Sequence, residues 1–310
     1  MRLRALAVCC LVAPACALSG CGLGPGEERE GGVELRVTRD FGKRVLGSDK
    51  VAKVREDQTV MRLLRAENAV KTRYGGRFVQ AIGGIEGGGA GGFADWFFYV
   101  NGLESDVGAA EYELSPGDVV QWDHRNWRAT MDIRAIVGAF PEPFVSGIEG
   151  KRFPVRVECE SDDSRACRKV ADILEDQGVP ASSASLGVSG SRNVLRVVVA
   201  RWARARELAS ARRIEQGPHK SGVFARFRER GRALDLLDER GRVARAAAAG
   251  TGLVAALEPE DKQLFWLVTG VDKKGVERAA AALNRRTLRD AFAVAVGPGK
   301  AEKLPLRSGG

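Results

Sequence analysis

The chain has 310 residues, a formal net charge of +9 and a hydrophobic content of 44%. That length leaves room for two domains of ordinary size, and the hydrophobic content excludes a chain that is disordered throughout. Much of the basic excess lies in an arginine-rich stretch between Arg192 and Arg245. This stretch is either an ordinary solvated surface or a surface that meets anionic lipid heads or wall polymers.

The amino terminus has the three parts of a secretory signal. Arg2 and Arg4 form a short positive region, residues 5–17 are almost wholly apolar, and small residues close the segment. The apolar run is shorter than the roughly 20 residues that a membrane-spanning helix needs. We therefore expect residues 1–20 to be a signal peptide rather than part of the fold.

The end of this segment, Leu18-Ser19-Gly20-Cys21, resembles the bacterial lipobox. The resemblance implies cleavage before Cys21 and lipid on its thiol and on the new amino terminus; a plain secreted protein cut near Ala17 is the alternative. Residues 21–32 are rich in glycine and charge, which is typical of a flexible tether. We expect a protein anchored through lipid at the extracytoplasmic face of the cell membrane, where nucleic acid is not an expected partner.

Two cysteines remain beyond the signal region, Cys159 and Cys167. Outside the cytoplasm two such cysteines usually pair, so a disulfide is predicted between the end of one strand and the first turn of the next helix. Inert free thiols are the alternative. A metal site is disfavoured, because tetrahedral sites need about four ligands.

The first half of the chain alternates between strand and helix signals. Residues 33–41 have the period-two pattern of a half-buried strand, and Thr59 is a candidate N-cap for a helix that Gly75 and Gly76 would end. Asn101-Gly102 is a favoured tight-turn pair. In chain order the predicted elements are a strand at 33–41, a turn and strand at 42–54, a helix at 58–76, a short strand and glycine-rich loop at 78–92, a strong strand at 93–100 and a last strand at 119–127.

Four segments in this order resemble the transcobalamin-like C-terminal domain family, also catalogued as domain of unknown function 4430. They read TVMRLLR, WFFYVNG, GAAEYEL and PGDVVQW, and the resemblance covers about residues 33–127. It implies a β-grasp domain over residues 33–135 and, for some members, a role in holding cobalamin or a related soluble ligand. It does not imply which ligand, because function belongs to the site rather than to the fold.

The row of aromatics in DWFFYVNG raises the question of a binding surface. Successive side chains of a strand point to opposite faces, so Trp96 and Phe98 share one face while Phe97 and Tyr99 share the other. One face must pack on the helix. The other is either further packing or a ligand surface, and the glycine-rich loop just before the strand favours a mobile loop beside a site.

The segment QWDHRNW adds polar groups beside two more aromatics, a mixture that small-molecule sites use. Metal or corrin ligation by His124 is a minor alternative, and Asp123-His124 lacks a nucleophile with a supporting motif, so no catalytic residue and no enzyme activity are predicted. The candidate ligand-binding residues are Trp96, Tyr99, Trp122, Arg125, Asn126 and Trp127.

Residues 136–152 contain two prolines around a turn and are expected to be a linker. Residues 153–298 are expected to form a second α+β domain, with strand-helix-strand segments at 153–202 and 264–296 as halves of one sheet, and residues 299–310 a disordered tail. After the first of these segments, the pattern predicts a helix at 203–214, a meander at 222–250 and a hairpin at 252–270, whose second strand begins the second segment. No family resemblance is found for this half.

These patterns predict an α+β protein of two domains, a non-enzymatic lipoprotein that binds a small soluble ligand. A cobalamin-like cofactor is one candidate ligand, and a membrane importer is one candidate recipient. The alternative is an envelope lipoprotein whose aromatic face docks a protein partner.

Overall fold

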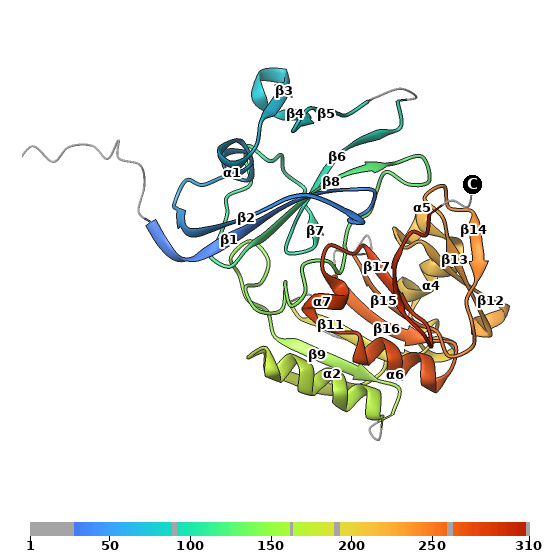
Figure 1. Cartoon of the computed structure of the whole chain (residues 1–310). Coiled ribbons are helices and arrows are strands. Elements are labelled where there is room, and N and C mark those ends of the chain that lie inside the picture. Colours follow the sequence, from blue (N-terminus) through green and yellow to red (C-terminus); the bar gives the residue numbers. More distant parts are fainter. Residues whose placement is uncertain (1–27, 89–91, 162–163, 189–192, 259–262, 308–310) are drawn as a thin grey trace, which may run out of the picture.

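The computed structural model describes residues 28–88, 92–161, 164–188, 193–258 and 263–307. Figure 1 shows a first domain built on a five-stranded sheet and a second built on a seven-stranded sheet. Helices accompany both sheets, so the predicted α+β class is confirmed. The predicted signal peptide and Cys21 lie outside the described residues, and no described helix is long and apolar enough to cross a membrane.

The sheet of the first domain has the strand order β2-β1-β8-β6-β7. β1 pairs antiparallel with β2 and parallel with β8, and β8 pairs antiparallel with β6, which with one helix is a β-grasp arrangement. The predicted tether is wrong for residues 28–32, because this extended chain finds backbone partners on β2. The strands are β1 (Glu28–Arg39), β2 (Arg44–Arg55), β6 (Ala94–Val100), β7 (Leu103–Glu104) and β8 (Val119–Asn126).

Alternation along β1 places its apolar side chains under the helix, as predicted. Val33, Leu35 and Val37 are buried in one cluster with Leu63 and Leu64. The helix, α1 (Val60–Glu67), starts at the predicted N-cap, where the side-chain oxygen of Thr59 accepts a hydrogen bond from the Arg62 backbone N at 3.2 Å.

The predicted end of this helix at Gly75 and Gly76 is wrong. α1 ends at Glu67, and the next residues form β3 (Val70–Arg73), which pairs with β4 (Phe78–Ile82). β5 (Ile85–Glu86) completes this small three-stranded sheet. The two glycines instead lie in η1 (Tyr74–Gly76), the connection between β3 and β4, where both have positive φ.

The turn at Asn101-Gly102 is confirmed. Both residues have positive φ, 53° and 80°, which matches the twist of the strands that the turn joins. It closes the β6–β7 hairpin with Val100 opposite Leu103. A Cβ at Gly102 would lie 2.6 Å from the Ile136 carbonyl oxygen, so the position also requires glycine for space.

The sheet of the second domain has the order β10-β9-β11-β16-β15-β17-β18. The first four strands are parallel and the last three pair antiparallel. The two strand-helix-strand segments therefore do share one sheet, as predicted. The strands are β9 (Val155–Cys159), β10 (Ala181–Ser185), β11 (Leu195–Arg201), β15 (Gly252–Leu257), β16 (Phe265–Gly270), β17 (Ala293–Val296) and β18 (Ala301–Leu304).

β18 corrects the predicted disordered tail. It pairs along its whole length with β17, its Leu304 side chain is fully buried, and the Leu306 backbone N donates to the Leu237 carbonyl oxygen at 2.7 Å. The segment is ordered because an apolar side chain and an open sheet edge stabilise it, neither of which its glycine- and lysine-rich sequence indicates. Of the predicted tail, only residues 308–310 lie outside the described residues.

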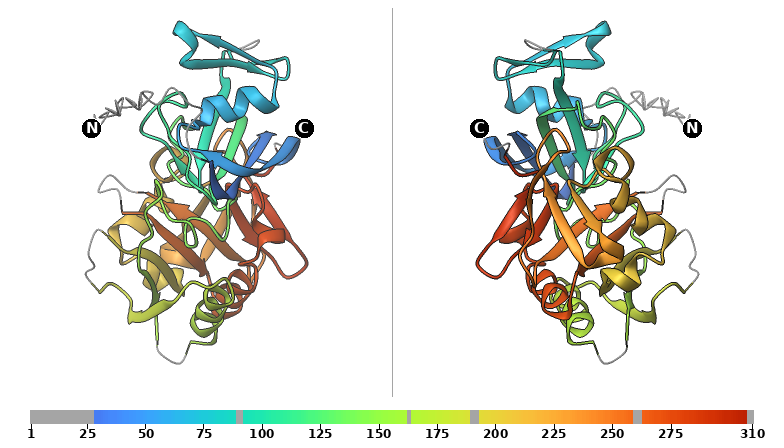
Figure 2. Two further views of the ribbon diagram at one scale, coloured as in Figure 1. Left: turned by 90° about the vertical axis from the view of Figure 1, so that its left-hand side faces the viewer. Right: turned by 90° about the vertical axis from the view of Figure 1, so that its right-hand side faces the viewer.

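The two faces of this sheet are covered by different elements. α2 (Arg165–Asp176) and α6 (Lys273–Ala281) pack together on one face, where Figure 2 shows them at the end of the molecule away from the first domain. The other face meets a predicted meander, confirmed as β12 (Ala225–Arg228), β13 (Ala233–Leu237) and β14 (Val243–Ala246).

The helix predicted at 203–214 is broken into short pieces. Trp202 and Phe227 stack with ring centroids 4.1 Å apart, and the first piece packs on the sheet through Trp202 and Ala205. The contacts with sheet and meander outweigh the helix preference of the sequence. The short helices of the second domain are α3 (Trp202–Ala205), α4 (Ala209–Arg212), η2 (Arg213–Gln216), α5 (Pro218–Ser221), η3 (Glu229–Gly231) and α7 (Arg285–Leu288).

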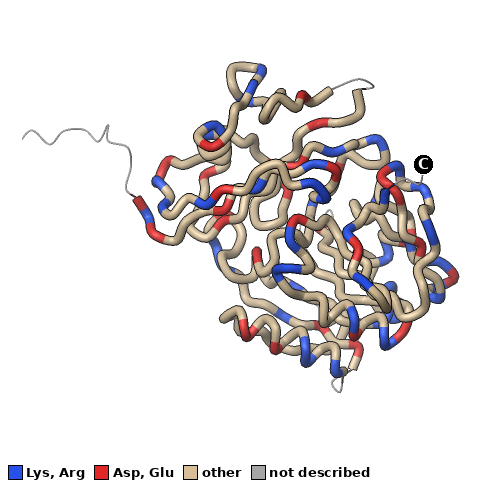
Figure 3. Tube along the Cα trace, in the orientation of Figure 1, with Lys and Arg blue, Asp and Glu red and all other residues tan. Residues whose placement is uncertain are grey.

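Many charges of the arginine-rich stretch are paired rather than gathered into one basic surface. Figure 3 shows acidic and basic residues interleaved along the second domain. This distribution favours the ordinary solvated surface over a site for anionic polymers. The ion pairs are Arg201–Glu160, Arg206–Glu215, Arg228–Asp235, Arg242–Asp238 and Arg245–Glu302.

The predicted Cys159–Cys167 disulfide is confirmed, with Cα atoms 5.9 Å apart. It joins the end of β9 to the first turn of α2. The N-cap of that helix is Ser164, whose hydroxyl oxygen accepts from the Cys167 backbone N at 3.3 Å.

Candidate functional site

The helix-facing side of the aromatic row is core. Trp96 and Trp122 are both buried in the cluster under α1, and the indole N–H of Trp96 donates to the Ile85 carbonyl oxygen at 2.9 Å. Phe98 packs against Trp122 with ring centroids 5.1 Å apart. The prediction that Trp96 and Trp122 contact a ligand is therefore corrected, because neither indole is accessible.

The opposite side of the row is covered by the second domain. Tyr99 is fully buried, and its ring meets that of Phe292 at 5.5 Å. Phe41, at the β1–β2 turn, contacts both Phe224 and Phe292, with centroids 5.0 and 5.3 Å apart. We call Phe41, Tyr99, Phe224 and Phe292 the interdomain aromatic cluster. Tyr99 belongs to this packing, which corrects its predicted role as a ligand contact.

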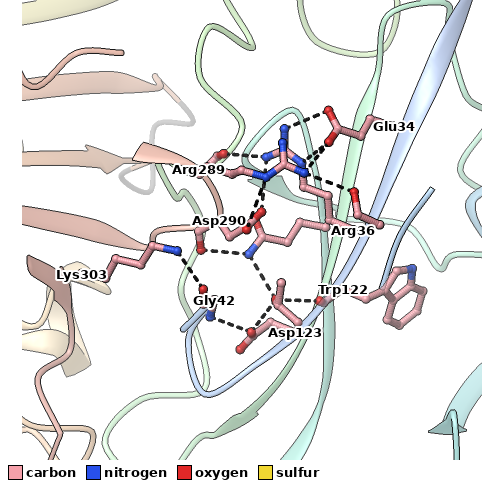
Figure 4. A network of polar contacts seen from close by, with 12 residues as sticks. Glu34, Arg36, Gly42, Trp122, Asp123, Arg289, Asp290 and Lys303 are labelled. Carbon is pink, nitrogen blue, oxygen red and sulfur yellow. Dashed lines mark hydrogen bonds and ion pairs between the residues drawn. The ribbon is translucent and has the colours of Figure 1, made fainter. Parts of the chain in front are cut away.

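A fully buried carboxylate supports this cluster. Asp123 accepts hydrogen bonds from the Thr38 hydroxyl at 2.7 Å and from the backbone N–H groups of Phe41 and Gly42 at 2.9 and 2.8 Å (Figure 4). Burial raises the pKa of Asp123 to about 6, and these hydrogen bonds oppose the rise. Asp40 and Phe41 have positive φ, so the carboxylate holds the turn that aims Phe41 at the second domain.

An arginine links the two domains beside this carboxylate (Figure 4). Arg36 donates to the Gly138 carbonyl oxygen at 2.8 Å, and its guanidinium pairs with Glu34 at 2.9 Å and Asp290 at 3.5 Å. Arg289 also donates to Glu34, at 2.8 Å. Burial would raise the pKa of Glu34, but the two arginines lower it to about 2.

Two further bonds cross the same boundary. The Gln121 side-chain amide donates to the Asp290 carbonyl oxygen at 3.1 Å, and the Lys303 ammonium donates to the Gly42 carbonyl oxygen at 3.0 Å. Aromatic packing and charge-assisted hydrogen bonds thus act together. The predicted linker, residues 136–152, takes part through its buried Ile136, so it is a packed connection.

Arg125 is also buried, which corrects its predicted role as a ligand contact. Its guanidinium lies 3.7 Å from the centroid of the Phe97 ring and donates to the carbonyl oxygens of Thr130 and Met131 at 3.2 and 2.6 Å. These contacts satisfy the charge by a cation–π interaction and by backbone oxygens. Arg125 therefore positions the chain that leads into the second domain.

Asn126 and Trp127 remain at the surface, at the end of β8. The Trp127 ring lies 5.2 Å from the Phe93 ring. The Arg128 guanidinium lies 4.1 Å from the centroid of the Phe93 ring. The Asn126 side-chain oxygen accepts from the Arg128 backbone N at 2.8 Å. We call Phe93, Asn126, Trp127 and Arg128 the strand-end cluster. The sequence prediction missed Phe93 and Arg128, although both flank the segments that it selected.

His124 lies beside this cluster and does not face Asp123. Its Nε2 is 3.2 Å from the Glu86 carbonyl oxygen, its ring packs 5.1 Å from that of Trp96, and burial lowers its pKa. Across the described ranges, no group of three or more His, Cys, Asp or Glu side chains could hold a metal ion. The structure offers no support for metal ligation by His124 in the part of the chain that it describes.

Comparison with known proteins agrees with the resemblance of the first domain. The family model described as "Domain of unknown function (DUF4430)" matches residues 57–126. A chain from Ruminococcus gnavus ATCC 29149, described as "a putative metal binding protein", is similar with 13% identity over 31% of this chain and 98% of its own, at a TM-score of 0.25. That likeness is too weak to carry an argument. No curated protein matches this chain significantly.

Proposed function

We propose that this protein is a non-enzymatic lipoprotein of the extracytoplasmic face of the cell membrane, and that it binds a soluble ligand through the strand-end cluster. The observation that carries the proposal is that Phe93 and Arg128 are exposed around the half-buried Trp127, whereas Trp96, Trp122 and Tyr99 are buried. A cobalamin-like cofactor is the first ligand to test, and delivery to a membrane importer is the role that the lipid anchor favours.

The chemistry of the cluster suits such contacts. Trp127 and Phe93 supply apolar ring surface, Arg128 supplies a planar cation, and the Asn126 amide supplies hydrogen-bonding groups. Phe93 follows the glycine-rich loop directly, and the Gly88 backbone N donates to the Ala94 carbonyl oxygen at 2.7 Å, which ties the near end of that loop to β6. Gly88 and Phe93 therefore both lie at the start of β6.

A protein partner is the second candidate, and the exposure of Phe93 and Arg128 favours it. Phe93 is 38% exposed and lies under the Arg128 guanidinium. Aromatic and arginine side chains carry much of the energy of protein interfaces. In this role the protein would dock an envelope component instead of a cofactor.

The test is a thermal-shift screen of the purified protein with cobalamins and other cofactors. A ligand that binds only the folded state must raise the melting temperature. We expect Trp127→Ala to keep the fold and lose that shift. Tyr74→Ala is the matched control, because Tyr74 is an exposed aromatic of the same domain that packs on Phe78 instead.

The partner role predicts a different result. No cofactor would shift the melting temperature, and a photo-crosslinker at position 128 in intact cells would join the protein to one defined envelope component, whereas a crosslinker at position 74 would not. If ligand and partner binding both persist unchanged in Trp127→Ala, the strand-end cluster is not the site.

A further inference from the structure

The second domain contains a crevice of about 360 Å³ at the carboxyl ends of β9 and β11. Residues at β9, β11 and α6 are among those that line the crevice. They include Glu160 and Ser161, directly after β9, Arg201 at the end of β11, and Lys273 and Glu277 on α6. Asp162 and Asp163, between β9 and α2, lie outside the described residues.

The crevice lies where the connections of the sheet diverge. After β9 the chain passes to α2 on one face and returns as β10 on the outer side of β9. After the neighbouring β11 it passes to α3 on the other face and returns to the sheet as β15 and β16 on the inner side. Ligands of open α/β sheets bind at such switch points, outside the carboxyl ends of the strands.

One wall of the crevice is held in place covalently and by an ion pair. The Cys159–Cys167 disulfide ties the end of β9 to the first turn of α2. The Glu160 carboxylate accepts from the backbone N and the guanidinium Nε of Arg201, both at 2.9 Å. Burial raises the pKa of Glu160, but its bonds to Arg201 outweigh this and lower it. The Glu160 and Arg201 charges therefore neutralise each other. Because this wall is already in place, the protein would lose less conformational entropy on binding a ligand.

Two opposite charges in the crevice are not satisfied in this way. Neither the Lys273 nor the Glu277 side chain makes a hydrogen bond or ion pair with any residue that the structure describes. They lie four residues apart on α6, a spacing at which a lysine and a glutamate can pair. The crevice therefore presents an ammonium and a carboxylate, four residues apart on α6, that no described side chain neutralises.

We propose that this crevice binds a small zwitterion of the amino-acid class, with the ligand carboxylate on Lys273 and the ligand ammonium on Glu277. The volume lies near the lower end of the range for small-molecule pockets. It suits an amino acid or a very short peptide and is too small for a corrinoid. This site lies in the other domain from the strand-end cluster and does not depend on the function proposed for that cluster.

The test is isothermal titration of the purified protein with a panel of L-amino acids, their N-acetyl derivatives and their carboxamides. We expect at least one free amino acid to bind, and both of its blocked derivatives to bind at least tenfold more weakly. Lys273→Gln and Glu277→Gln should each weaken the free amino acid at least tenfold. Lys274→Gln is the matched control, because Lys274 is the next exposed lysine on α6 and does not line the crevice; its affinity should be unchanged.

Three results would overturn the proposal. The first is that no amino acid binds, and the second is that binding survives in both crevice variants. The third is that an N-acetyl derivative binds as tightly as the free amino acid, which would mean a site for a simple anion. Trp127→Ala should leave amino-acid binding intact, so failure at the strand-end cluster and failure at the crevice give distinguishable outcomes.

Discussion

The ring of Tyr99 meets the ring of Phe292 edge to face, with centroids 5.5 Å apart and planes at 79°, across the boundary between the two domains. Tyr99 lies on the face of the first-domain sheet opposite α1, and Phe292 lies directly before β17 of the second domain. The side of the aromatic row that could have been a ligand surface is thus an internal contact, and the two domains share one core there.

This contact predicts a large loss of stability for Tyr99→Ala. Removing a fully buried aromatic ring should lower the free energy of unfolding by about 3 to 5 kcal/mol, measured by chemical denaturation. Tyr99→Phe is the control. Among the residues that the structure describes, none hydrogen-bonds to the buried Tyr99 hydroxyl, although Arg125 lies near it, so this variant should be neutral or gain up to about 1 kcal/mol. Equal losses in both variants would contradict the packing role.

The disulfide predicts a stability loss of about 2.5 kcal/mol when Cys159 and Cys167 are both changed to Ser, from the loop entropy of a closure eight residues apart. Peptide mass spectrometry after alkylation checks the bond itself. Without reductant, the peptides that carry these cysteines should remain joined and unmodified, and with reductant both should be alkylated. Alkylated Cys159 in the unreduced, freshly purified protein would rule the bond out.

Asp123 predicts a pH dependence of stability. Its pKa rises from 3.8 to about 6 on folding, so the folded state holds the proton more tightly than the unfolded state. The contribution of Asp123 to the free energy of unfolding is therefore greatest below about pH 4. It declines as the pH rises to about 6 and is constant above that. The full difference corresponds to about 3 kcal/mol.

Asp123→Asn isolates this effect. Subtracting the stability of the variant from that of the native chain across pH 4 to 7 cancels groups such as Glu34, whose lowered pKa acts in the opposite sense. The difference should fall with rising pH. The amide also places an N–H group near the backbone N–H groups of Phe41 and Gly42, but this fixed cost does not vary with pH. A flat difference would mean that Asp123 is ionised throughout.

The Leu18-Ser19-Gly20-Cys21 segment predicts lipid anchoring. Cys21→Ala should move the protein from the membrane fraction to the soluble or secreted fraction and remove the acyl mass, because only a thiol at that position can carry the lipid thioether. Cys16→Ala is the control, since it changes a cysteine inside the predicted signal and should leave the membrane fraction unchanged. An unchanged membrane fraction in Cys21→Ala would refute the anchor.

Local sequence was sufficient where a feature depends on a few neighbouring residues. The N-cap at Thr59, the turn at Asn101-Gly102 and the alternation of Val33, Leu35 and Val37 were all predictable, because each follows from side-chain chemistry or strand periodicity within one segment. The disulfide was predictable because two cysteines at short spacing leave few choices.

The candidate site was predicted only in part. The sequence selected Asn126 and Trp127, which are half-buried at the surface, but the same reasoning selected Trp96, Trp122 and Tyr99, which are buried. Aromatic residues occur both in protein cores and on binding surfaces. Their positions in the sequence alone therefore do not show which of the two roles each one has.

The sequence by itself determined the α+β class and the two faces of the aromatic strand. Only the tertiary structure decided what covers the second face, since that depends on Phe224 and Phe292, which lie more than a hundred residues away. It also decided that 301–304 forms an edge strand and that Lys273 and Glu277 meet Glu160 and Arg201 in one crevice. Such relationships arise from long-range packing and sheet pairing, whose partners no local pattern specifies.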